Sequence, residues 1–197
     1  MIKKMSSHDL KPMKRPNILF LCGSLRRDST NRGLLRAAAT FLKPEQADIV
    51  WGSCDLPLYN ADIAPVPEQV ETLCKQIQEA DAVLIGCPEY NWGMTGALKN
   101  ALDWISMRPG AFASRGGLPV ASLSAGGPVG ALNASTQLKE FVVKSKAQYV
   151  ETPNPVNIKL WDGPPKFDAH GNLTDDSFLP AIQSVVHLLL EKAQARP

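Results

Sequence analysis

No hydrophobic run in this sequence of 197 residues reaches the length of a membrane-spanning helix. The first fifteen residues carry five lysines and arginines without an apolar h-region, which argues against a secretory signal. We expect residues 1–15 to form a disordered basic extension and residues 16–197 to form a single domain. A formal net charge of only +2 gives no reason to expect a nucleic-acid or membrane partner.

Cysteine and histidine are scarce and scattered. The four cysteines show no CxxC spacing and the three histidines form no pair, so the sequence predicts no metal site. Cys22 and Cys87 lie in apolar runs, where a reduced thiol behaves as a small hydrophobic group. This usage is typical of a reducing compartment, and we expect the protein to be cytoplasmic.

Three familiar patterns of phosphate chemistry are missing from the chain. No G-x-x-x-x-G-K-[ST] loop is present, which excludes a Walker A nucleotide site. Only Gly23 follows the first apolar run, where the dinucleotide pattern G-x-G-x-x-G needs three glycines. A cysteine phosphatase would need an arginine six positions after Cys22, where this chain has Asp28, whose charge would repel a phosphate.

Apolar runs of strand length alternate with segments of helical periodicity along the chain. The runs are residues 18–22, 47–51, 82–86, 119–124 and, interrupted by prolines, 149–158. Helical spacing begins at residue 31, recurs at 70–77, 96–107 and 134–142, and returns at 178–189. Continuously apolar strands are typical of a parallel sheet that is covered on both faces. The pattern predicts an α/β fold, namely a flavodoxin-like doubly wound five-stranded parallel sheet of order 2-1-3-4-5 with helices on both faces.

In such sheets, ligands bind at the carboxyl ends of the strands, around the point where the strand order reverses. This rule selects the loops after the first, third and fourth predicted strands, residues 23–31, 87–96 and 124–130. These loops are also the richest in Gly, Ser, Pro and Asn. We therefore expect the functional site to lie where these three loops meet.

The loop after the first strand has the composition of an anion site. A helix start presents free N–H groups and the positive end of its dipole to an anion. Ser24, Ser29 and Thr30 add hydroxyl groups, and Arg26 or Arg27 adds a charge-assisted pair. Capping of the helix by a hydroxyl would not require the arginines, so the loop predicts a binding site for a monophosphate.

The loop after the third strand, C-P-E-Y-N-W-G, combines a rigid proline, two aromatic side chains and a glycine. Such a loop can lie against a flat, largely apolar ring. Together with the neighbouring phosphate site, it fits flavin mononucleotide (FMN). For Trp92, flavin contact and packing at a surface or an interface remain alternatives.

Two motifs resemble the NADPH-dependent FMN reductase family, which includes bacterial quinone and chromate reductases. Residues 23–32, G-S-L-R-R-D-S-T-N-R, are similar to the family pattern G-S-L-R-x-x-S-x-N. Residues 88–104 are similar to the pattern P-E-Y-N-x-x-x-x-G-x-L-K-N-A-I-D-W, and the resemblance extends over about residues 17–190. It implies tightly bound, non-covalent FMN, with NADPH or NADH as substrate. The residues that it implies are Ser24, Arg26, Ser29, Thr30 and Asn31 at the phosphate, Pro88, Glu89, Tyr90 and Asn91 beside the isoalloxazine, and Ser124, Gly126 and Gly127 on the pyrimidine side.

The sequence departs from the family pattern at two positions. Thr95 stands where members often carry proline, and Asn133 stands where many have an arginine at the start of the helix after strand four. We expect these changes to affect substrate preference and subunit contacts more than flavin binding. A structural or interface role is expected for the matching positions inside the helix of the second motif, Lys99, Asn100, Asp103 and Trp104.

The resemblance implies hydride transfer from NAD(P)H to the flavin, followed by electron transfer to a quinone, flavin, azo or metal-oxyanion acceptor. The cofactor carries this chemistry, so no side chain is predicted to act as a catalytic acid or base, and Glu89 is interpreted as a turn-stabilising carboxylate. A homodimer or homotetramer is also implied. Two alternatives remain, a flavodoxin-like electron carrier and an FMN-binding redox sensor without turnover of its own. Arg26 and the near-neutral charge argue against the carrier, which typically has an arginine-free phosphate loop and an acidic surface.

Overall fold

The computed structural model describes residues 15–108, 112 and 117–196. Helices and strands alternate along the chain, as the periodicity predicts. Their bounds are β1 (Asn17–Cys22), α1 (Thr30–Ala39), β2 (Asp48–Ser53), α2 (Glu68–Glu79), β3 (Ala82–Gly86), β4 (Glu89–Tyr90), β5 (Gly93–Met94), α3 (Gly96–Ser106), β6 (Pro119–Gly126), α4 (Leu132–Lys144), β7 (Gln148–Tyr149), β8 (Asn157–Lys159), the 3₁₀ turn η2 (Asp176–Phe178) and α5 (Leu179–Gln194).

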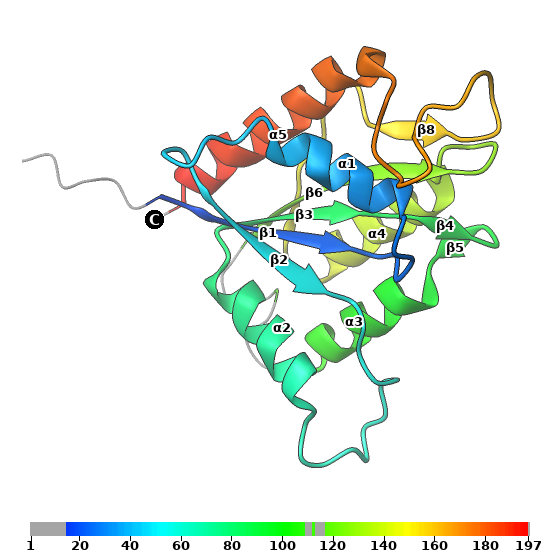
Figure 1. Ribbon diagram of the computed structural model, residues 1–197. Coiled ribbons are helices and arrows are strands. Elements are labelled where there is room, and N and C mark those ends of the chain that lie inside the picture. The colour runs from blue at the N-terminus through cyan, green and yellow to red at the C-terminus, as the bar shows by residue number, and fades with distance from the viewer. Residues whose placement is uncertain (1–14, 109–111, 113–116, 197) are drawn as a thin grey trace, which may run out of the picture.

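The main sheet is parallel and has the order β2-β1-β3-β6-β7, with β8 paired to the far end of β6 (Figure 1). With the two-stranded β4–β5 hairpin set aside, this is the order 2-1-3-4-5, and the predicted doubly wound fold is confirmed. The order reverses between β1 and β3, so the loops that follow these strands diverge from one another at the carboxyl edge.

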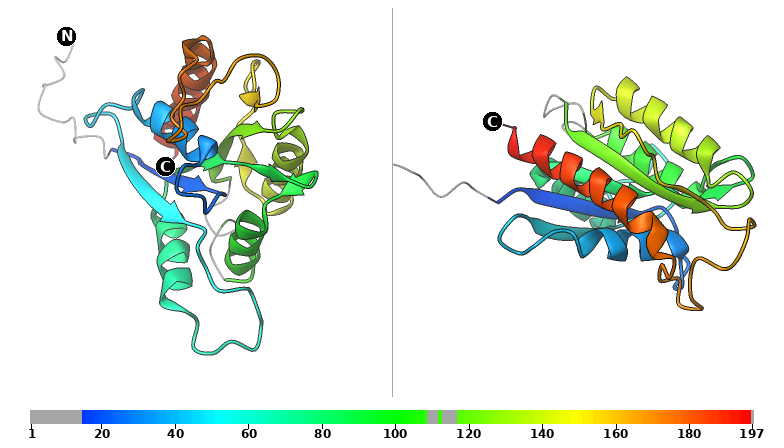
Figure 2. Two further views of the ribbon diagram at one scale, coloured as in Figure 1. Left: turned by 45° about the vertical axis from the view of Figure 1, so that its right-hand side comes forward. Right: turned by 90° about the horizontal axis from the view of Figure 1, so that it is seen from above.

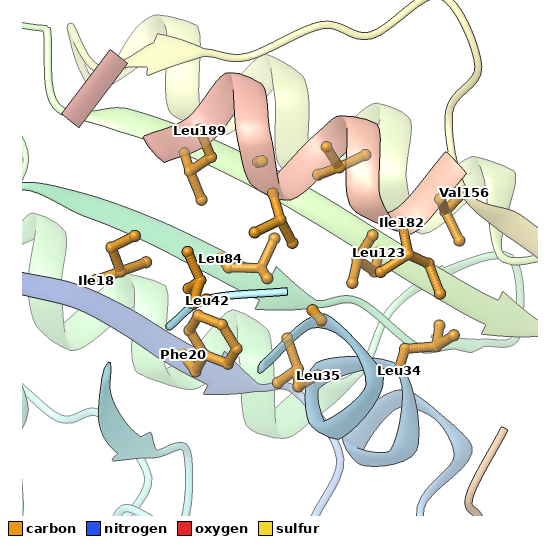
Figure 3. Packing of buried hydrophobic residues seen from close by; sticks show 14 of the residues in the cluster. Ile18, Phe20, Leu34, Leu35, Leu42, Leu84, Leu123, Val156, Ile182 and Leu189 are labelled. Atoms are coloured by element: carbon orange, nitrogen blue, oxygen red, sulfur yellow. The ribbon is translucent and has the colours of Figure 1, made fainter. Parts of the chain in front are cut away.

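Side chains that alternate along the strands build a separate core on each face of the sheet. Ile18 and Phe20 of β1 pack with α1 and α5, while Leu19 and Leu21 pack with α2 and α3 on the opposite face. Figure 2 shows this layering, and Figure 3 shows the α1–α5 side, where Leu34, Leu35, Ile182 and Leu189 converge on the sheet. Burial on both faces explains why the central strands are apolar without interruption.

The fifth strand is interrupted, as its prolines predict. The chain pairs with the start of β6 as β7, leaves the sheet through Pro153 and Pro155, and returns to the end of β6 as β8. Proline has no N–H to donate to a sheet, so the intervening segment cannot continue the pairing. As a result, β8 lies beside the carboxyl end of β6, next to one of the three predicted loops.

The long loop between β2 and α2 is held by the helix of the second motif. Asn100 accepts a hydrogen bond from the Tyr59 N–H (2.7 Å) and donates to the carbonyl of Pro57 (2.9 Å), and the Trp104 indole N–H donates to the same carbonyl (2.7 Å). The rings of Tyr59 and Trp104 meet edge to face at 4.9 Å. These contacts give Asn100 and Trp104 the structural role that their place in the motif predicts.

A segment near the C-terminus, residues 166–174, packs over the start of α1. Its carbonyl at Gly171 approaches Gly33 so closely that a Cβ atom on Gly33 would lie 1.8 Å from the carbonyl oxygen. The Arg36 side chain reinforces the contact by donating to the Asn172 amide oxygen (2.9 Å) and to the His170 carbonyl (3.2 Å). We call residues 166–174 the C-terminal strap.

Of the predicted N-terminal extension, only Arg15 belongs to the described residues, and it pairs with Asp48 at 3.1 Å. None of the helices in the described part of the chain is long and apolar enough to cross a membrane. Within the same residues, no group of three or more His, Cys, Asp or Glu side chains is placed to hold a metal ion.

Candidate functional site

The three predicted loops lie side by side at the carboxyl edge of the sheet. Backbone hydrogen bonds join their first residues: the Gly23 N–H donates to Gly86 (2.9 Å), and the Cys87 N–H donates to Leu123 (2.9 Å). The loops after β1, β3 and β6 are therefore fixed to neighbouring strands before their side chains are considered. This is the edge at which ligands bind in doubly wound sheets.

The first loop ends in a capped helix. Ser29 has extended backbone angles (φ −80°, ψ 124°), and its hydroxyl accepts a hydrogen bond from the Arg32 N–H (3.3 Å). The buried Ser24 hydroxyl accepts from the Arg26 N–H in the same way (3.3 Å). A helix has no internal partner for its first N–H groups, and those of Thr30 and Asn31 lie in this first turn. The loop thus has the donors that a phosphate requires.

Arginines surround this helix start. Arg26 and Arg27 are exposed, and the Arg27 side chain lies beside Asp28 (Nε to Oδ2, 3.4 Å). Arg32 folds back from the first turn of α1 and donates from Nη2 to the Ser24 carbonyl (3.5 Å). Sequence reasoning did not include Arg32 among the site residues, although it lies within the quoted motif, three residues after the cap. Its position in the first helical turn was the signal that could have identified it.

The Asn31 side chain has a partner within the protein. Asn31 is buried, its Nδ2 donates to the Ala125 carbonyl (2.8 Å), and its Oδ1 accepts from the Ala125 N–H (3.0 Å). Both polar ends of the amide are therefore used to tie α1 to the end of β6. The motif position implies a contact between the Asn31 side chain and the phosphate, but both polar ends of that side chain are already bonded to Ala125. The donor that remains for a phosphate is the Asn31 backbone N–H.

Thr95, one of the two departures from the family pattern, connects the second loop to the first. It is buried, its hydroxyl donates to the Gly23 carbonyl (2.6 Å), and the same oxygen caps α3 by accepting from the Leu98 N–H (3.2 Å). A proline at this position could make neither bond. The substitution therefore adds a hydrogen bond between two loops of the site.

Replacing Thr95 with valine should lower the free energy of unfolding by about 2 kcal/mol, because a helix cap is lost and the Gly23 carbonyl loses its buried donor. Urea denaturation of the two proteins measures the difference. Thr136→Val is the matched control, since the exposed Thr136 hydroxyl donates to the Leu132 carbonyl of its own helix and bonds to no other described residue. It should change stability by less than about 0.5 kcal/mol. Equal effects of the two substitutions would contradict the connecting role of Thr95.

The second loop forms a hairpin that the sequence did not predict. Strands β4 and β5 pair antiparallel, and the two residues between them, Asn91 (φ 49°) and Trp92 (φ 68°), are both left-handed. Two-residue turns of this kind match the twist of a hairpin but favour Asn and Gly, so Trp92 occupies a strained position. Tyr90 and Trp92 are 52% and 68% exposed, which leaves aromatic surface at the rim of the site. Pro88 is buried behind them, beside Gly23.

Polar contacts with α4 fix the orientation of this hairpin. The Glu89 carboxylate accepts hydrogen bonds from the Ala134 N–H (3.0 Å) and from Asn133 Nδ2 (3.1 Å). The N-cap residue of α4, Ala131, has only a methyl side chain, which cannot accept a hydrogen bond. The Glu89 carboxylate, from β4, therefore caps the first turn of α4. Gln137 adds a third contact by accepting from the Met94 N–H (3.0 Å). Asn133, the second departure from the family pattern, therefore binds the carboxylate of the second motif.

The third loop contains a buried hydroxyl without a protein partner. Ser124 is fully buried, and its Oγ makes no hydrogen bond to any described residue.

Glycines shape the backbone of the third loop. Gly126 packs against Ala131, where a Cβ atom would lie 3.0 Å from the alanine Cβ. Gly130 (φ 68°) lies so close to Asn157 that a Cβ would meet its carbonyl oxygen at 2.4 Å. This loop can follow its path only with glycine at position 130.

The buried thiols near the loops are not acidic. Burial, with a smaller contribution from the Glu89 carboxylate, raises the pKa of Cys87 to about 12, and burial also raises the pKa of Cys54. Both groups therefore remain neutral thiols at physiological pH. A thiolate nucleophile at these positions is inconsistent with this environment.

A profile of the family described as NADPH-dependent FMN reductase matches residues 16–157, which include all three loops. The chain belongs to this family. The NADPH-dependent FMN reductases are oxidoreductases, and the predicted resemblance, activity class and cofactor are confirmed. Residues 158–197, which contain the C-terminal strap and α5, lie outside the matched part.

Relatives of known activity agree with this assignment. The NAD(P)H:quinone oxidoreductase of Solanum tuberosum is 37% identical over 172 residues, which cover 84% of this chain and 87% of the relative. The NAD(P)H-dependent FMN reductase of Pseudomonas aeruginosa is 34% identical over 175 residues, with 87% and 92% covered. Among solved structures, the flavoenzyme FerB, an NAD(P)H:(acceptor) oxidoreductase from Paracoccus denitrificans, superposes with a TM-score of 0.74 at 29% identity and covers 92% of this reductase and 98% of FerB.

The residues of this reductase fit FMN. Hydroxyls, guanidinium groups and a helix start gather at the first loop, which is the donor set that a phosphate monoester requires. The second loop presents exposed aromatic surface, and the third loop holds the unpartnered Ser124 hydroxyl. The structure thus brings the predicted site residues to one edge of the sheet. The side chains of Asn31 and Glu89 are bonded there to other parts of the protein, Asn31 to Ala125 and Glu89 to the start of α4.

Proposed function

We propose that this reductase passes electrons from NAD(P)H to quinones, with free flavins, azo compounds and metal oxyanions as further candidate acceptors. FMN, when bound, supplies the chemistry by taking up hydride and delivering electrons to the acceptor. One observation carries the proposal. The capped start of α1, which suits an anion, and the β4–β5 hairpin with its exposed aromatic side chains lie at the same edge of the sheet. The choice of quinones as acceptors is supported by relatives such as the NAD(P)H:quinone oxidoreductase of Solanum tuberosum.

The protein binds and orients the cofactor in this proposal. Ser24, Arg26, Ser29 and Thr30, joined by Arg32, hold the phosphate through hydroxyl, guanidinium and backbone N–H donors. Pro88, Glu89, Tyr90 and Asn91 form the wall beside the isoalloxazine, with Glu89 acting through the position of the hairpin. Ser124, Gly126 and Gly127 border the pyrimidine side, where the Ser124 hydroxyl would gain a partner. No side chain is assigned a proton-transfer step.

A visible absorption spectrum tests the function directly. We expect the purified protein to be yellow or to take up added FMN, and to bleach when NADPH or NADH is added without oxygen. Re-oxidation by a quinone completes the test. A protein that fails to bind FMN would contradict the site, and bound flavin that stays oxidised would favour the electron carrier or the redox sensor.

We also propose that the protein forms a homodimer or homotetramer in the cytoplasm. Exposed apolar side chains, such as Leu58 (81%), Tyr90 (52%) and Trp92 (68%), support association, because a subunit interface would remove them from water. Four free, buried cysteines suit a reducing compartment. Light scattering should give a mass above that of one chain, and a monomer would contradict the oligomer.

A further inference from the structure

Trp161 is the most exposed aromatic side chain near the site, and it lies outside the part of the chain that matches the family. The residue is 79% exposed and follows β8, close to the β6–α4 loop. Its ring lies beside the site: a Cβ atom on Gly127 would lie 3.8 Å from two carbons of the indole six-membered ring. The indole therefore lies on the side of Gly127 where a Cβ would project, and it presents most of its surface to solvent.

The backbone that carries Trp161 is fixed to the third loop. Strand β8 pairs with the end of β6 in the register Ser124↔Asn157 to Gly126↔Lys159. The next residue, Leu160, donates its N–H toward the carbonyls of Gly127 (3.0 Å) and Gly126 (3.3 Å). Each of these bonds joins the Trp161 segment to a residue of the proposed site.

The turn that follows Trp161 is closed by its own residues. The Lys166 ammonium group donates to the carbonyls of Asp162 and Pro164, and the two consecutive prolines at 164 and 165 restrict the backbone. A rigid turn lowers the entropy cost of using an exposed side chain for binding. The backbone on both sides of Trp161 is thus fixed, which keeps the indole next to the third loop.

We propose that Trp161 is a specificity-determining residue, whose indole stacks against the ring of planar aromatic acceptors such as bicyclic quinones. The inference rests on the proposed function, because it places the acceptor at the edge of the same site. An exposed indole beside a glycine offers a flat apolar surface to an aromatic ring. Ferricyanide, a compact inorganic acceptor, has no planar ring that could stack on the indole.

Steady-state kinetics of the FMN-loaded enzyme test the proposal with Trp161→Leu and Trp161→Phe. Trp161→Leu should raise the KM for 1,4-naphthoquinone by roughly three- to tenfold, while kcat, the KM for NADPH and turnover with ferricyanide stay unchanged. Trp161→Phe should restore most of the lost affinity because it keeps an aromatic face. Met107→Ala is the matched control, since Met107 is also exposed (61%) but caps the C-terminal end of α3, the end away from the second loop, and should change none of these values.

Other outcomes would overturn the assignment. An unchanged KM for naphthoquinone in Trp161→Leu would show that the indole does not contact the acceptor. A weaker FMN affinity, measured by flavin fluorescence, would assign Trp161 to the cofactor, and a raised KM for NADPH would assign it to the nucleotide. Wild-type protein that binds no FMN would contradict the proposed function itself, a result that is distinct from all of these.

Discussion

Replacing Arg26 with alanine is expected to weaken FMN binding roughly thirtyfold, because a charge-assisted hydrogen bond to the phosphate, worth about 2 kcal/mol, is lost. The fold should be unaffected, since Arg26 is exposed and only its backbone N–H bonds to Ser24. Titration of the apoprotein with FMN, followed by flavin fluorescence, measures the dissociation constant. Far-UV circular dichroism verifies that the fold is retained.

Arg27→Ala provides a matched control for this experiment, because it removes the same charge from the adjacent position. The Arg27 side chain is 94% exposed and lies against Asp28, so its loss should change FMN affinity by less than about threefold. Arg32→Ala should weaken FMN binding more than Arg27→Ala and less than Arg26→Ala, because the Arg32 side chain reaches the phosphate loop from α1. Equal affinities of Arg26→Ala and the wild type would refute the phosphate role of Arg26.

The second large effect is expected at Gly33, where α1 meets the C-terminal strap. Gly33→Ala would place a Cβ 1.8 Å from the Gly171 carbonyl oxygen, so the strap has to move. Overpacking against backbone of this kind should cost about 3 kcal/mol, which corresponds to a fall in melting temperature of roughly 6–12 °C for a domain of this size. Thermal unfolding followed by circular dichroism measures the shift.

The same substitution should also weaken FMN binding. Gly171 lies against the backbone of Asp28 and Ser29, so movement of the strap disturbs the helix cap in the phosphate loop. Gly96→Ala is the control for stability: nothing lies within 4 Å of its added Cβ, and alanine suits a helix, so the melting temperature should stay equal or rise slightly. A Gly33→Ala protein as stable as the Gly96→Ala protein would contradict the packing role of the strap.

Much of the fold was predictable because its signals are local. The strand order follows from continuously apolar runs such as 82–86 separated by helical periodicity, and the structure confirms it. The β4–β5 hairpin was missed because its strands have two residues each and its turn contains tryptophan in place of the usual glycine. Short strands with unusual turn residues leave almost no periodic signal to detect.

The sequence by itself determined the family, the doubly wound sheet and the three loops of the proposed site, since each depends on motifs or periodicity within one segment. Only the tertiary structure decided what each polar side chain does there. Asn31 bonds to Ala125 across 94 residues, Glu89 caps α4 from 45 residues away, and Trp161 lies over Gly127. No local pattern encodes these contacts, because they exist only when the sheet brings distant strand ends to the same edge.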